Sequence, residues 1–447
     1  MHRLVAVSNR LPLCDNPSGG LVVALQDALS NSGGLWIGFS GEQSEDPAET
    51  LTFHDGARFQ RASFDLSEED FDSYYLGYSN SVLWPAFHGR ADLIEIDPVF
   101  LDGYRRVSEK IARMMVPHLK EDDRIWIQDY QLIPLAAALR KLGVTNRIGF
   151  FLHIPFPDPA TCAALPNPKE MFEWLSQYDL IGFQAQRDVR NFTESAAQLA
   201  EIEMPGDDVI RLCQRETRAG AFPIGIDAAG FMGDARKARE EDRMRSLTNS
   251  KMMIGVDRLD YSKGIPQRFR AFQLLLENNP DLTEKVMLLQ IAPPTRESVE
   301  AYQDIREETE HLAGRINGQF ATVNWTPIRF IHRPIPRHEL AGLYRQANVG
   351  LVTPLADGMN LVAKEYVAAQ DVANPGVLIL SRFAGAAETM DEALIVNPHD
   401  PWDMADAMKR AINMTSNERR RRHSALLQNV VESDVAWWAD NYLKKLG

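Results

Sequence analysis

The chain has 447 residues, which suggests two to four domains at roughly 100–200 residues per domain. Its hydrophobic, charged and aromatic fractions of 45%, 25% and 9% are typical of globular proteins and exclude a disordered or collagen-like chain. The formal net charge of −14 weighs against nucleic-acid partners and anionic membrane surfaces, because both require a basic field. A local basic pocket for a phosphorylated substrate is still compatible with this charge.

The three cysteines, Cys14, Cys162 and Cys213, are odd in number and include no CxxC pair. They therefore support neither a disulfide framework nor a zinc ribbon, and they favour a reducing cytoplasm. The apolar run Leu4–Val7 is too short for a signal peptide. No uncharged apolar run approaches the ~18 residues that span a membrane. We expect a soluble cytoplasmic protein; the sequence leaves open whether it forms a homo-oligomer.

Short apolar runs alternate with helical segments along the chain. The predicted strands are Leu4–Ser8, Leu35–Phe39, Arg124–Ile127, Arg147–His153, Leu180–Phe183, Ala221–Ile224, Lys251–Val256, Lys285–Ile291, Ile328–Ile331, Val349–Val352, Val377–Leu380 and Ala393–Val396. Several of these runs are apolar on both faces, as parallel strands covered by helices should be. The predicted helices include Asp102–Leu119, Leu132–Leu142, Gln267–Asn278, Arg296–Ala313 and Arg337–Arg345. This alternation predicts an α/β fold with doubly wound parallel sheets.

The alternation occurs twice, which predicts two Rossmann-like domains. We expect the first domain over residues 1–227 and the second over residues 228–429, with a linker around residues 225–230. The last segment, Val430–Leu446, carries tryptophan and tyrosine residues at helical spacing. It is predicted to be a helix that packs back on the first domain.

Ligands of doubly wound α/β proteins bind at the carboxyl ends of the strands. The first strand ends at Arg10, and a loop then leads to Gly19 and Gly20, where the backbone can approach a ligand closely. An ordinary glycine turn is the alternative interpretation of this pair. The aromatic segment that contains Tyr75 and Trp84 suits a sugar face, and its alternative is an aromatic core.

Two polar residues follow buried strands in the first half. Asp129 comes directly after a strand, where a carboxylate is costly unless it is paired or faces a ligand. Its alternative role is the N-cap of the helix that begins near Leu132. His153 ends another strand and is followed by two prolines, and its alternative role is purely structural.

The second half has two such strand ends. Arg258 and Lys263 flank a turn that enters a helix, and two cations with a glycine at a helix start favour a diphosphate. The alternative is a surface ion pair between Arg258 and Asp260. Further on, Asp357-Gly358-Met359-Asn360 precedes a helix that contains Glu365, a carboxylate suited to the hydroxyl pair of a ribose. The alternative role of Glu365 is a salt bridge. Neither a GxGxxG nor a Walker A sequence is present.

Together these motifs resemble the retaining glycosyltransferases of the two-Rossmann GT-B fold, of the family 20 type, the trehalose-6-phosphate synthase family. The resemblance extends from Val7 to Pro398 and includes Gly314–Gly318, Trp325–Pro327 and Val367–Asp371. It implies two Rossmann-like domains that face a cleft, the first binding an acceptor and the second a nucleotide sugar. It further implies glucose transfer from UDP-glucose to glucose 6-phosphate, giving α,α-trehalose 6-phosphate and UDP.

The resemblance also implies a role for each matching residue. The acceptor would be held by Arg10, Tyr75, Trp84, Asp129 and Arg296, with the arginines on its phosphate. The donor would be held by Gly19, Gly20, Arg258, Lys263, Ile335, Asp357, Gly358, Met359, Asn360, Leu361, Val362, Ala363, Lys364 and Glu365. The main chain of Ile335 would contact the nucleobase. The residues expected at the reaction itself are His153, Asp129, Arg258 and Lys263. No metal and no cofactor is expected, because the cations replace a metal.

The chain departs from the family pattern around Asp129. The family segment commonly reads His-Asp-Tyr-His, whereas this chain has Gln128 and Gln131 in place of the histidines. Glutamine keeps hydrogen bonding but carries no charge or proton near neutral pH. Another acceptor, such as glycerol 3-phosphate or a cyclitol phosphate, is therefore one alternative, and a non-catalytic sugar-phosphate sensor is a second. Ala356 stands where a bulkier residue is usual, which leaves the donor base open.

Overall fold

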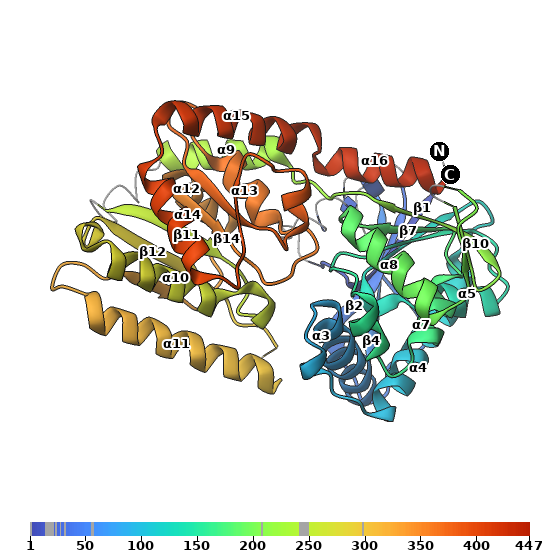
Figure 1. Ribbon diagram of the computed structural model, residues 1–447. Helices are drawn as coiled ribbons and strands as arrows, with labels where there is room; N and C mark the ends of the chain where they lie inside the picture. The colour runs from blue at the N-terminus through green and yellow to red at the C-terminus, as the bar shows by residue number, and fades with distance from the viewer. Residues whose placement is uncertain are drawn as a thin grey trace. The chain divides into compact units, whose positions relative to one another are not determined.

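The computed structural model describes residues 2–13, 22, 25–26, 28–30, 33–54, 58–206, 209–240, 250–296 and 299–447. The chain divides into two compact units (Figure 1). The first comprises Met1–Pro223 with Val435–Gly447, and the second comprises Ile224–Asp434. Each unit is built on its own parallel-rich sheet, so the predicted α/β fold is confirmed. Among the described residues, no helix combines the length and the apolar character that crossing a membrane requires.

The first unit is built on a ten-stranded sheet. Its strands are β1 (Leu4–Arg10), β2 (Leu35–Gln43), β3 (Thr52–His54), β4 (Gln60–Leu66), β5 (Arg124–Gln128), β6 (Arg147–Phe151), β7 (Leu180–Phe183), β8 (Ile202–Glu203), β9 (Val209–Leu212) and β10 (Arg215–Ala221). Their order in the sheet is β3-β4-β2-β1-β5-β6-β7-β10-β9-β8. The strands from β4 to β10 pair in parallel, while the short strands β3, β8 and β9 pair antiparallel at the two edges.

Helices cover this sheet. They are α2 (Glu68–Asp70), α3 (Trp84–Phe87), α4 (Pro98–Met115), α5 (Leu135–Lys141), α6 (Pro159–Ala163), α7 (Pro168–Leu175), α8 (Gln186–Leu199) and α16 (Val435–Leu446), with the π-helix η1 (Phe71–Leu83) and the 3-10 turns η2 (Ala91–Leu93), η3 (Val116–His118) and η4 (Tyr130–Leu132). The C-terminal helix α16 packs on β6 and β7. There the Tyr442 hydroxyl donates to the Phe150 carbonyl at 2.9 Å, and its ring stacks on Trp126 at 4.7 Å.

The second unit has a six-stranded, fully parallel sheet. Its strands are β11 (Lys251–Val256), β12 (Val286–Ile291), β13 (Ile328–Ile331), β14 (Val349–Val352), β15 (Val377–Ser381) and β16 (Leu394–Val396). Their order, β13-β12-β11-β14-β15-β16, reverses between β11 and β14, as in dinucleotide-binding folds. All six residues of β12 are buried, as its apolar run predicts.

Helices lie on both faces of this sheet. They are α9 (Ala228–Glu240), α10 (Ile265–Asn278), α11 (Glu300–Phe320), α12 (Arg337–Gln346), α13 (Leu361–Ala369), α14 (Pro401–Asn413) and α15 (Ser416–Glu432), with the 3-10 turns η5 (Tyr261–Lys263), η6 (Pro280–Leu282) and η7 (Gly385–Glu388). Figure 1 shows α10 and α11 on one side of the sheet, and α9 and α13 on the other. This double cover explains why the strands read as uninterrupted apolar runs.

Several predicted elements are wrong in their bounds; the helix expected at Asp102–Leu119, for example, is α4 (Pro98–Met115). The strand expected at Ala221–Ile224 shares only Ala221 with β10, which begins at Arg215, ends at Ala221 and alternates exposed polar residues with buried ones. The helix expected from Arg296 begins at Glu300, because Arg296 has a left-handed φ of +49°. The segment Val430–Leu446 is divided, since α15 ends at Glu432 and α16 begins at Val435.

Candidate active site

The first unit gathers several predicted residues at one edge of its sheet. The strand order reverses at β1, which lies between β2 and β5. Arg10 is the last residue of β1, Asp129 follows β5, and His153 stands two residues after β6. Carboxyl ends of parallel strands meet at the same edge, and ligands of such sheets bind outside the point of reversal. The three residues predicted from strand ends in the first half of the chain thus lie at the same edge of one sheet.

Arg10 is exposed and lies against a glycine of the neighbouring strand. Gly41 has a φ of +99°, and a Cβ there would lie 2.6 Å from Nη2 of Arg10. Position 41 therefore requires glycine for two reasons: only glycine adopts this backbone conformation readily, and any side chain would collide with the Arg10 guanidinium. Gly19 and Gly20, which the sequence places in a loop after Arg10, lie outside the described residues.

The aromatic segment forms η1 and the start of α3. Tyr75 is half-buried beside Phe71, with ring centroids 5.1 Å apart, and its hydroxyl forms no hydrogen bond within the described part of the chain. Trp84 is only 3% exposed and packs on Tyr130 with ring centroids 5.7 Å apart. Tyr75 thus offers a hydroxyl to a ligand, whereas Trp84 is mainly core.

Asp129 stands at the N-cap position of η4, but its side chain does not cap that helix. No side-chain capping bond is formed at η4, and Oδ1 of Asp129 instead accepts from the backbone N–H of His153 at 3.0 Å. Asp129 has φ +74° and ψ 168°, a region that residues other than glycine rarely occupy. Such a conformation costs about 1–3 kcal/mol and is concentrated at functional sites. The hydrogen bond to His153 links two of the predicted residues.

His153 is held between two glutamines. Its Nε2 lies 2.9 Å from Oε1 of Gln128, and its Nδ1 lies 3.3 Å from Nε2 of Gln184, both within hydrogen-bond distance. Burial lowers the pKa of His153 to about 3, so its imidazole is neutral at physiological pH. Gln184 was not predicted, although it directly follows β7 and could have been found by the same rule that selected His153.

The second unit presents its predicted residues at the point where its strand order reverses. Arg258 follows β11 and is exposed, while the segment from Thr353 to Asn360 follows β14, the neighbouring strand. Between the two segments, Nζ of Lys263 forms an ion pair with Oδ2 of Asp357 at 2.7 Å. Asn360 donates to the same oxygen at 3.0 Å. The pair therefore spans the point where a ligand of such a sheet is expected.

The turn after Lys263 depends on Gly264. This glycine has a φ of +66°, and a Cβ there would lie 2.6 Å from the Thr353 carbonyl oxygen. Under the turn, the fully buried Arg268 donates to Asp257 at 2.7 Å and to the Thr353 hydroxyl at 3.0 Å. These bonds join the ends of β11 and β14. They therefore restrain the loop that carries Arg258 and Lys263.

Asp260 is fully buried, so it is not an exposed carboxylate, as the alternative of a surface pair with Arg258 requires. Its Oδ2 accepts from the Tyr302 hydroxyl at 2.9 Å and lies 3.7 Å from Nη1 of Arg296. Nη1 of Arg296 also donates to Tyr302. Burial and the Asp260 charge raise the pKa of Tyr302, which stays protonated and donates to the carboxylate. The structure places Arg296 in the second unit, whereas Arg10, Tyr75, Trp84 and Asp129 belong to the first.

The segment before α13 offers backbone groups and one carboxyl. Asn360 has a φ of +69°, and the amides of Leu361 and Val362, at the N-terminus of α13, form no hydrogen bond within the described ranges. A helix N-terminus of this kind favours an anion. Lys364 does not contribute its side chain, because its Nζ donates to the Ile224 carbonyl at 2.7 Å. Burial lowers the pKa of Lys364 to about 8.

Glu365 forms no ion pair or hydrogen bond with the rest of the described chain, so the salt-bridge alternative is not found there. Burial raises the pKa of Glu365 to about 7, against an opposing effect of Arg337. Ile335, half-buried in the loop before α12, makes no main-chain hydrogen bond to any described residue. A carboxyl and main-chain groups are therefore available for polar contacts with a ligand.

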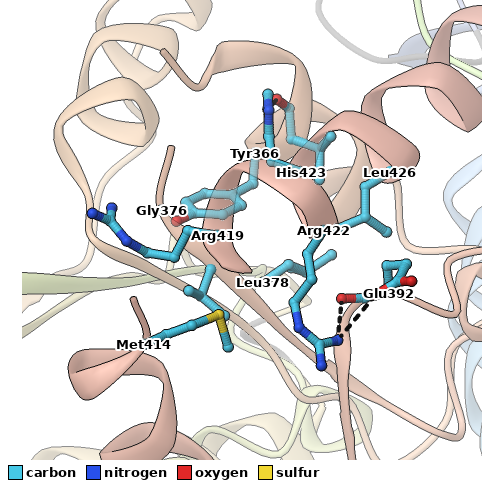
Figure 2. Close-up of a pocket in the computed structure, with 11 residues that line it drawn as sticks. Tyr366, Gly376, Leu378, Glu392, Met414, Arg419, Arg422, His423 and Leu426 are labelled. Atoms are coloured by element: carbon cyan, nitrogen blue, oxygen red, sulfur yellow. Dashed lines mark hydrogen bonds and ion pairs between the residues drawn. The ribbon is translucent and has the colours of Figure 1, made fainter. Parts of the chain in front are cut away.

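Two hollows within the units contain none of these residues. Figure 2 shows a pocket between α13, β15 and α15, in which Arg422 is paired with Glu392 at 3.3 Å and His423 donates to the Val367 carbonyl at 3.0 Å. Its volume of ≈ 10 Å³ is about that of one water. A groove of ≈ 670 Å³ in the first unit has carboxylates as half of its lining residues, and its Arg106 and Lys110 are both paired with Asp70. In the described residues, no group of three His, Cys, Asp or Glu side chains could hold a metal ion.

Comparison with known proteins identifies the family of this chain. The model of glycosyltransferase family 20 matches residues 6–447. The chain belongs to glycosyltransferase family 20. A family member from Sodalis glossinidius, named trehalose-6-phosphate synthase, is 45% identical over the whole chain and 96% of its own length. One of the same name from Klebsiella pneumoniae is 46% identical over the whole chain and 95% of its own length.

Solved structures of the family are similar over their full length. An α,α-trehalose-phosphate synthase (UDP-forming) from Burkholderia xenovorans, in complex with glucose-6-phosphate, is 47% identical with a TM-score of 0.95 and 99% coverage of both chains. The Escherichia coli protein bound with UDP-2-fluoro glucose is 45% identical with a TM-score of 0.94, and the match covers 99% of this chain and 98% of that one. The expected family and its two-Rossmann fold are therefore confirmed.

Proposed function

We propose that this family 20 chain transfers glucose from UDP-glucose to glucose 6-phosphate with retention, giving α,α-trehalose 6-phosphate and UDP. The observation that carries the proposal is the cation-and-amide arrangement of the second unit. Lys263, Arg258 and the N-terminus of α13 stand where the strand order reverses, the place and the chemistry that a diphosphate requires. Relatives that cover nearly the whole chain carry the corresponding names.

The donor is assigned mainly to residues of the second unit. Arg258 and Lys263 bind the diphosphate, and Glu365 accepts from the ribose hydroxyls. The main chain of Ile335 contacts the base. The donor surroundings are completed by Gly19 and Gly20 and by the segment Asp357, Gly358, Met359, Asn360, Leu361, Val362, Ala363 and Lys364. Lys364 contributes only its backbone, because its side chain is bonded to Ile224.

The acceptor is assigned to Arg10, Tyr75, Trp84, Asp129 and Arg296. The two arginines bind the 6-phosphate through charge-assisted hydrogen bonds. The Tyr75 hydroxyl and the Asp129 carboxylate are placed for sugar hydroxyls. Trp84 supports them from the core, because it exposes only 3% of its surface.

Transfer breaks the bond between C1 of glucose and the diphosphate oxygen and forms a bond from C1 to the acceptor hydroxyl oxygen. The acceptor proton passes to the leaving phosphate oxygen on the same face. Arg258 and Lys263 stabilise the charge that grows on the diphosphate, and Asp129 and His153 border the reacting glucose. The cations supply this stabilisation without a metal or cofactor.

Product analysis tests the proposal. The purified chain is incubated with UDP-, GDP- or ADP-glucose and with glucose 6-phosphate, and the products are separated by chromatography. We expect a non-reducing disaccharide phosphate and one equivalent of UDP. Release of free glucose alone, or no turnover with any donor, would overturn the assignment and favour a sugar-phosphate sensor.

One observation favours a second acceptor class. Gln131 is 8% exposed, and its Oε1 accepts no hydrogen bond from any described residue. A neutral amide here selects acceptor hydroxyls differently from the histidine common in the family. Glycerol 3-phosphate and a cyclitol phosphate therefore belong in the same assay, and a higher kcat/KM for either would identify the preferred acceptor. We place the protein in the reducing cytoplasm, in agreement with its free thiols Cys162 and Cys213.

A further inference from the structure

The strand ends of β5, β6 and β7 bring three side chains together in the first unit. Gln128 is the last residue of β5, His153 follows β6, and Gln184 follows β7. The three strands are neighbours in the sheet, so His153 has one glutamine on each side. Gln128 is fully buried and Gln184 is 2% exposed. Both ring nitrogens of His153 are therefore bonded to side chains that never carry a charge.

We propose that Gln128 and Gln184 are positioning residues that hold the His153 ring in a single neutral tautomer, with the proton on Nε2. A neutral imidazole has one donor and one acceptor nitrogen. The carbonyl of Gln128 faces Nε2 and can only accept, while the amide nitrogen of Gln184 faces Nδ1 and can only donate. Each partner thus specifies the same position for the proton.

The two glutamines act together. If the proton moved to Nδ1, the N–H of the ring would face the N–H of Gln184, and Nε2 would face the Gln128 oxygen without a proton. Both hydrogen bonds would then be lost, unless both amides turned over at once. A second proton would break the bond from Gln184 in the same way. Burial alone already lowers the pKa of His153, and the glutamines add a geometric reason for the same preference.

Packing fixes the ring plane as well. The His153 ring lies against Phe151 at a centroid distance of 4.7 Å and against Trp438 of α16 at 6.0 Å. Its backbone N–H is bound by Asp129. The ring is therefore restrained by hydrogen bonds at both nitrogens, by two aromatic rings and by its own backbone. A residue held in this way presents a fixed surface to a sugar and is not free to carry a proton.

The consequence for catalysis rests on the proposed function, whereas the tautomer itself does not. In transfer, His153 would serve as a fixed neutral packing group beside the glucose. Loss of either glutamine would remove about one neutral hydrogen bond that holds the His153 ring. The free energy of that bond corresponds to a roughly 3- to 10-fold lower rate of transfer. The family's usual histidine at the position of Gln128 could itself titrate, and the glutamine in this chain removes that second proton site.

Nitrogen NMR of the full chain tests the tautomer directly. The chain has ten histidines, so the His153 signals are identified by their loss in a His153→Gln spectrum. Long-range proton–nitrogen correlations then distinguish a protonated Nε2 from a protonated Nδ1. We expect a single Nε2–H form that does not change between pH 5 and pH 8. An Nδ1–H form, or titration of the ring within this range, would overturn the proposal.

Variants separate positioning from a merely structural role. Gln184→Leu removes the donor to Nδ1, and we expect a kcat lowered by roughly 3- to 10-fold, with KM values changing less, while Gln128 still favours the proton on Nε2. Gln128→Leu combined with Gln184→Leu removes both partners, and we expect a mixture of tautomers. Gln128→Glu keeps an acceptor for Nε2–H, so the tautomer is retained while the ring pKa rises. Gln198→Leu, at an exposed position on α8, is the matched control and leaves the spectrum and kcat unchanged. A ring that stays purely Nε2–H in the variant without both glutamines would overturn the proposal, and a wild-type chain with the expected tautomer but no transferase activity would refute only the proposed function.

Discussion

At the scale of single residues, two cations proposed to bind phosphate already contact a carboxylate of their own unit. Lys263 pairs with Asp357, and Arg296 lies beside the buried Asp260. A cation held in this way loses little conformational freedom when a phosphate arrives, because its side chain is already ordered. The carboxylate also keeps the nearby charge balanced without a ligand. The cost is competition, since a phosphate must share or displace the carboxylate.

Lys263→Ala tests the diphosphate assignment. Negative charge grows on the leaving diphosphate, so a fixed cation stabilises the transition state more than the ground state and raises kcat. We expect kcat to fall by roughly 10²–10³, with a smaller change in the affinity for UDP-glucose. Arg258→Lys should lower kcat in the same way, because an ammonium cannot replace the bidentate guanidinium. Steady-state kinetics measures both, with the exposed Lys285→Ala as the control. A near-wild-type kcat in both site variants would remove the diphosphate assignment.

Arg296→Ala tests the acceptor phosphate. A hydrogen bond to a charged group is worth about 1.5–3 kcal/mol, so the KM for glucose 6-phosphate should rise roughly 10-fold or more. The KM for UDP-glucose should change little. Arg270→Ala is the matched control, because Arg270 lies in the same unit and pairs with Glu308. An unchanged acceptor KM in a folded variant would leave Arg296 with only its structural contacts to Asp260 and Tyr302.

Glu365 predicts a pH dependence of donor binding. Its pKa is raised to about 7, so it is mostly protonated at pH 6 and mostly ionised at pH 8. A carboxylate accepts hydrogen bonds from two hydroxyls better than a carboxylic acid does. Donor binding should therefore favour the ionised form, and affinity should rise up to about 10-fold from pH 6 to pH 8 and then level off.

Calorimetry with UDP-glucose at constant ionic strength measures this slope. UDP-glucose is preferable to UDP, because its diphosphate has no proton to lose in this range. Glu365→Gln has a side chain of the same shape that can still hydrogen-bond but does not titrate. Its affinity for UDP-glucose should therefore not change with pH. The same slope in this variant would assign the pH dependence to another group.

At the scale of elements, the second unit was the easier one to predict. Three of its six strands, β12, β14 and β15, are short runs buried on both faces. The predicted bounds of Lys251–Val256, Ile328–Ile331 and Val349–Val352 agree with β11, β13 and β14. The first unit was harder, because the antiparallel edge strands β3, β8 and β9 are two to four residues long and partly exposed. The π-helix η1 was not foreseen, since its hydrogen-bond pattern has no sequence period of its own.

Site residues at strand ends could be predicted from the sequence, whereas contacts between distant segments could not. Strand ends can be recognised from sequence, and this recognition selected Arg10, Asp129 and His153 at one sheet edge. Contacts between distant segments cannot be recognised in this way. The pairing of Asp260 with Arg296, 36 positions apart, depends on the left-handed turn at Arg296 and on Tyr302, and neither has a local sequence signal.

Gly41 provides a test of how one strand supports a residue on its neighbour. Gly41→Ala places a Cβ 2.6 Å from Nη2 of Arg10, so the guanidinium must move. Gly89→Ala is the matched control, because Gly89 also has a positive φ, +70°, but nothing lies within 4 Å of its Cβ position. Both should lose about 1–2 kcal/mol of stability to the backbone conformation.

Only Gly41→Ala should also raise the KM for glucose 6-phosphate, to the level that Arg10→Ala gives. Urea denaturation and steady-state kinetics on the same preparations separate the two effects. Equal acceptor KM values in the two alanine variants would mean that the position of Arg10 does not matter for the acceptor.

At the scale of the whole molecule, the net charge is negative but the residues proposed to bind phosphates are cations. The chain carries a net charge of −14, yet the strand ends proposed to bind phosphates present Arg10, Arg258, Lys263 and Arg296. A negative surface repels polyanions such as nucleic acids, while local cations still attract a small phosphorylated ligand. Each of these cations is supported by its own unit, as Gly41 and Asp357 illustrate.

This distribution leads to a prediction about metals. If Arg258, Lys263 and the α13 amides neutralise the leaving diphosphate, a divalent cation has no charge left to balance there. Turnover should therefore continue at an unchanged rate in excess EDTA, and added magnesium or manganese should not raise it. Direct chromatographic detection of the disaccharide phosphate is required, because coupling enzymes that consume UDP often need magnesium themselves. Loss of turnover in EDTA that magnesium or manganese restores would show that a metal performs the role assigned to the cations. Repeating the titration on Lys263→Ala sharpens the test: if magnesium rescues that variant while the wild-type chain ignores it, the lysine and the metal are alternative solutions to the same electrostatic requirement.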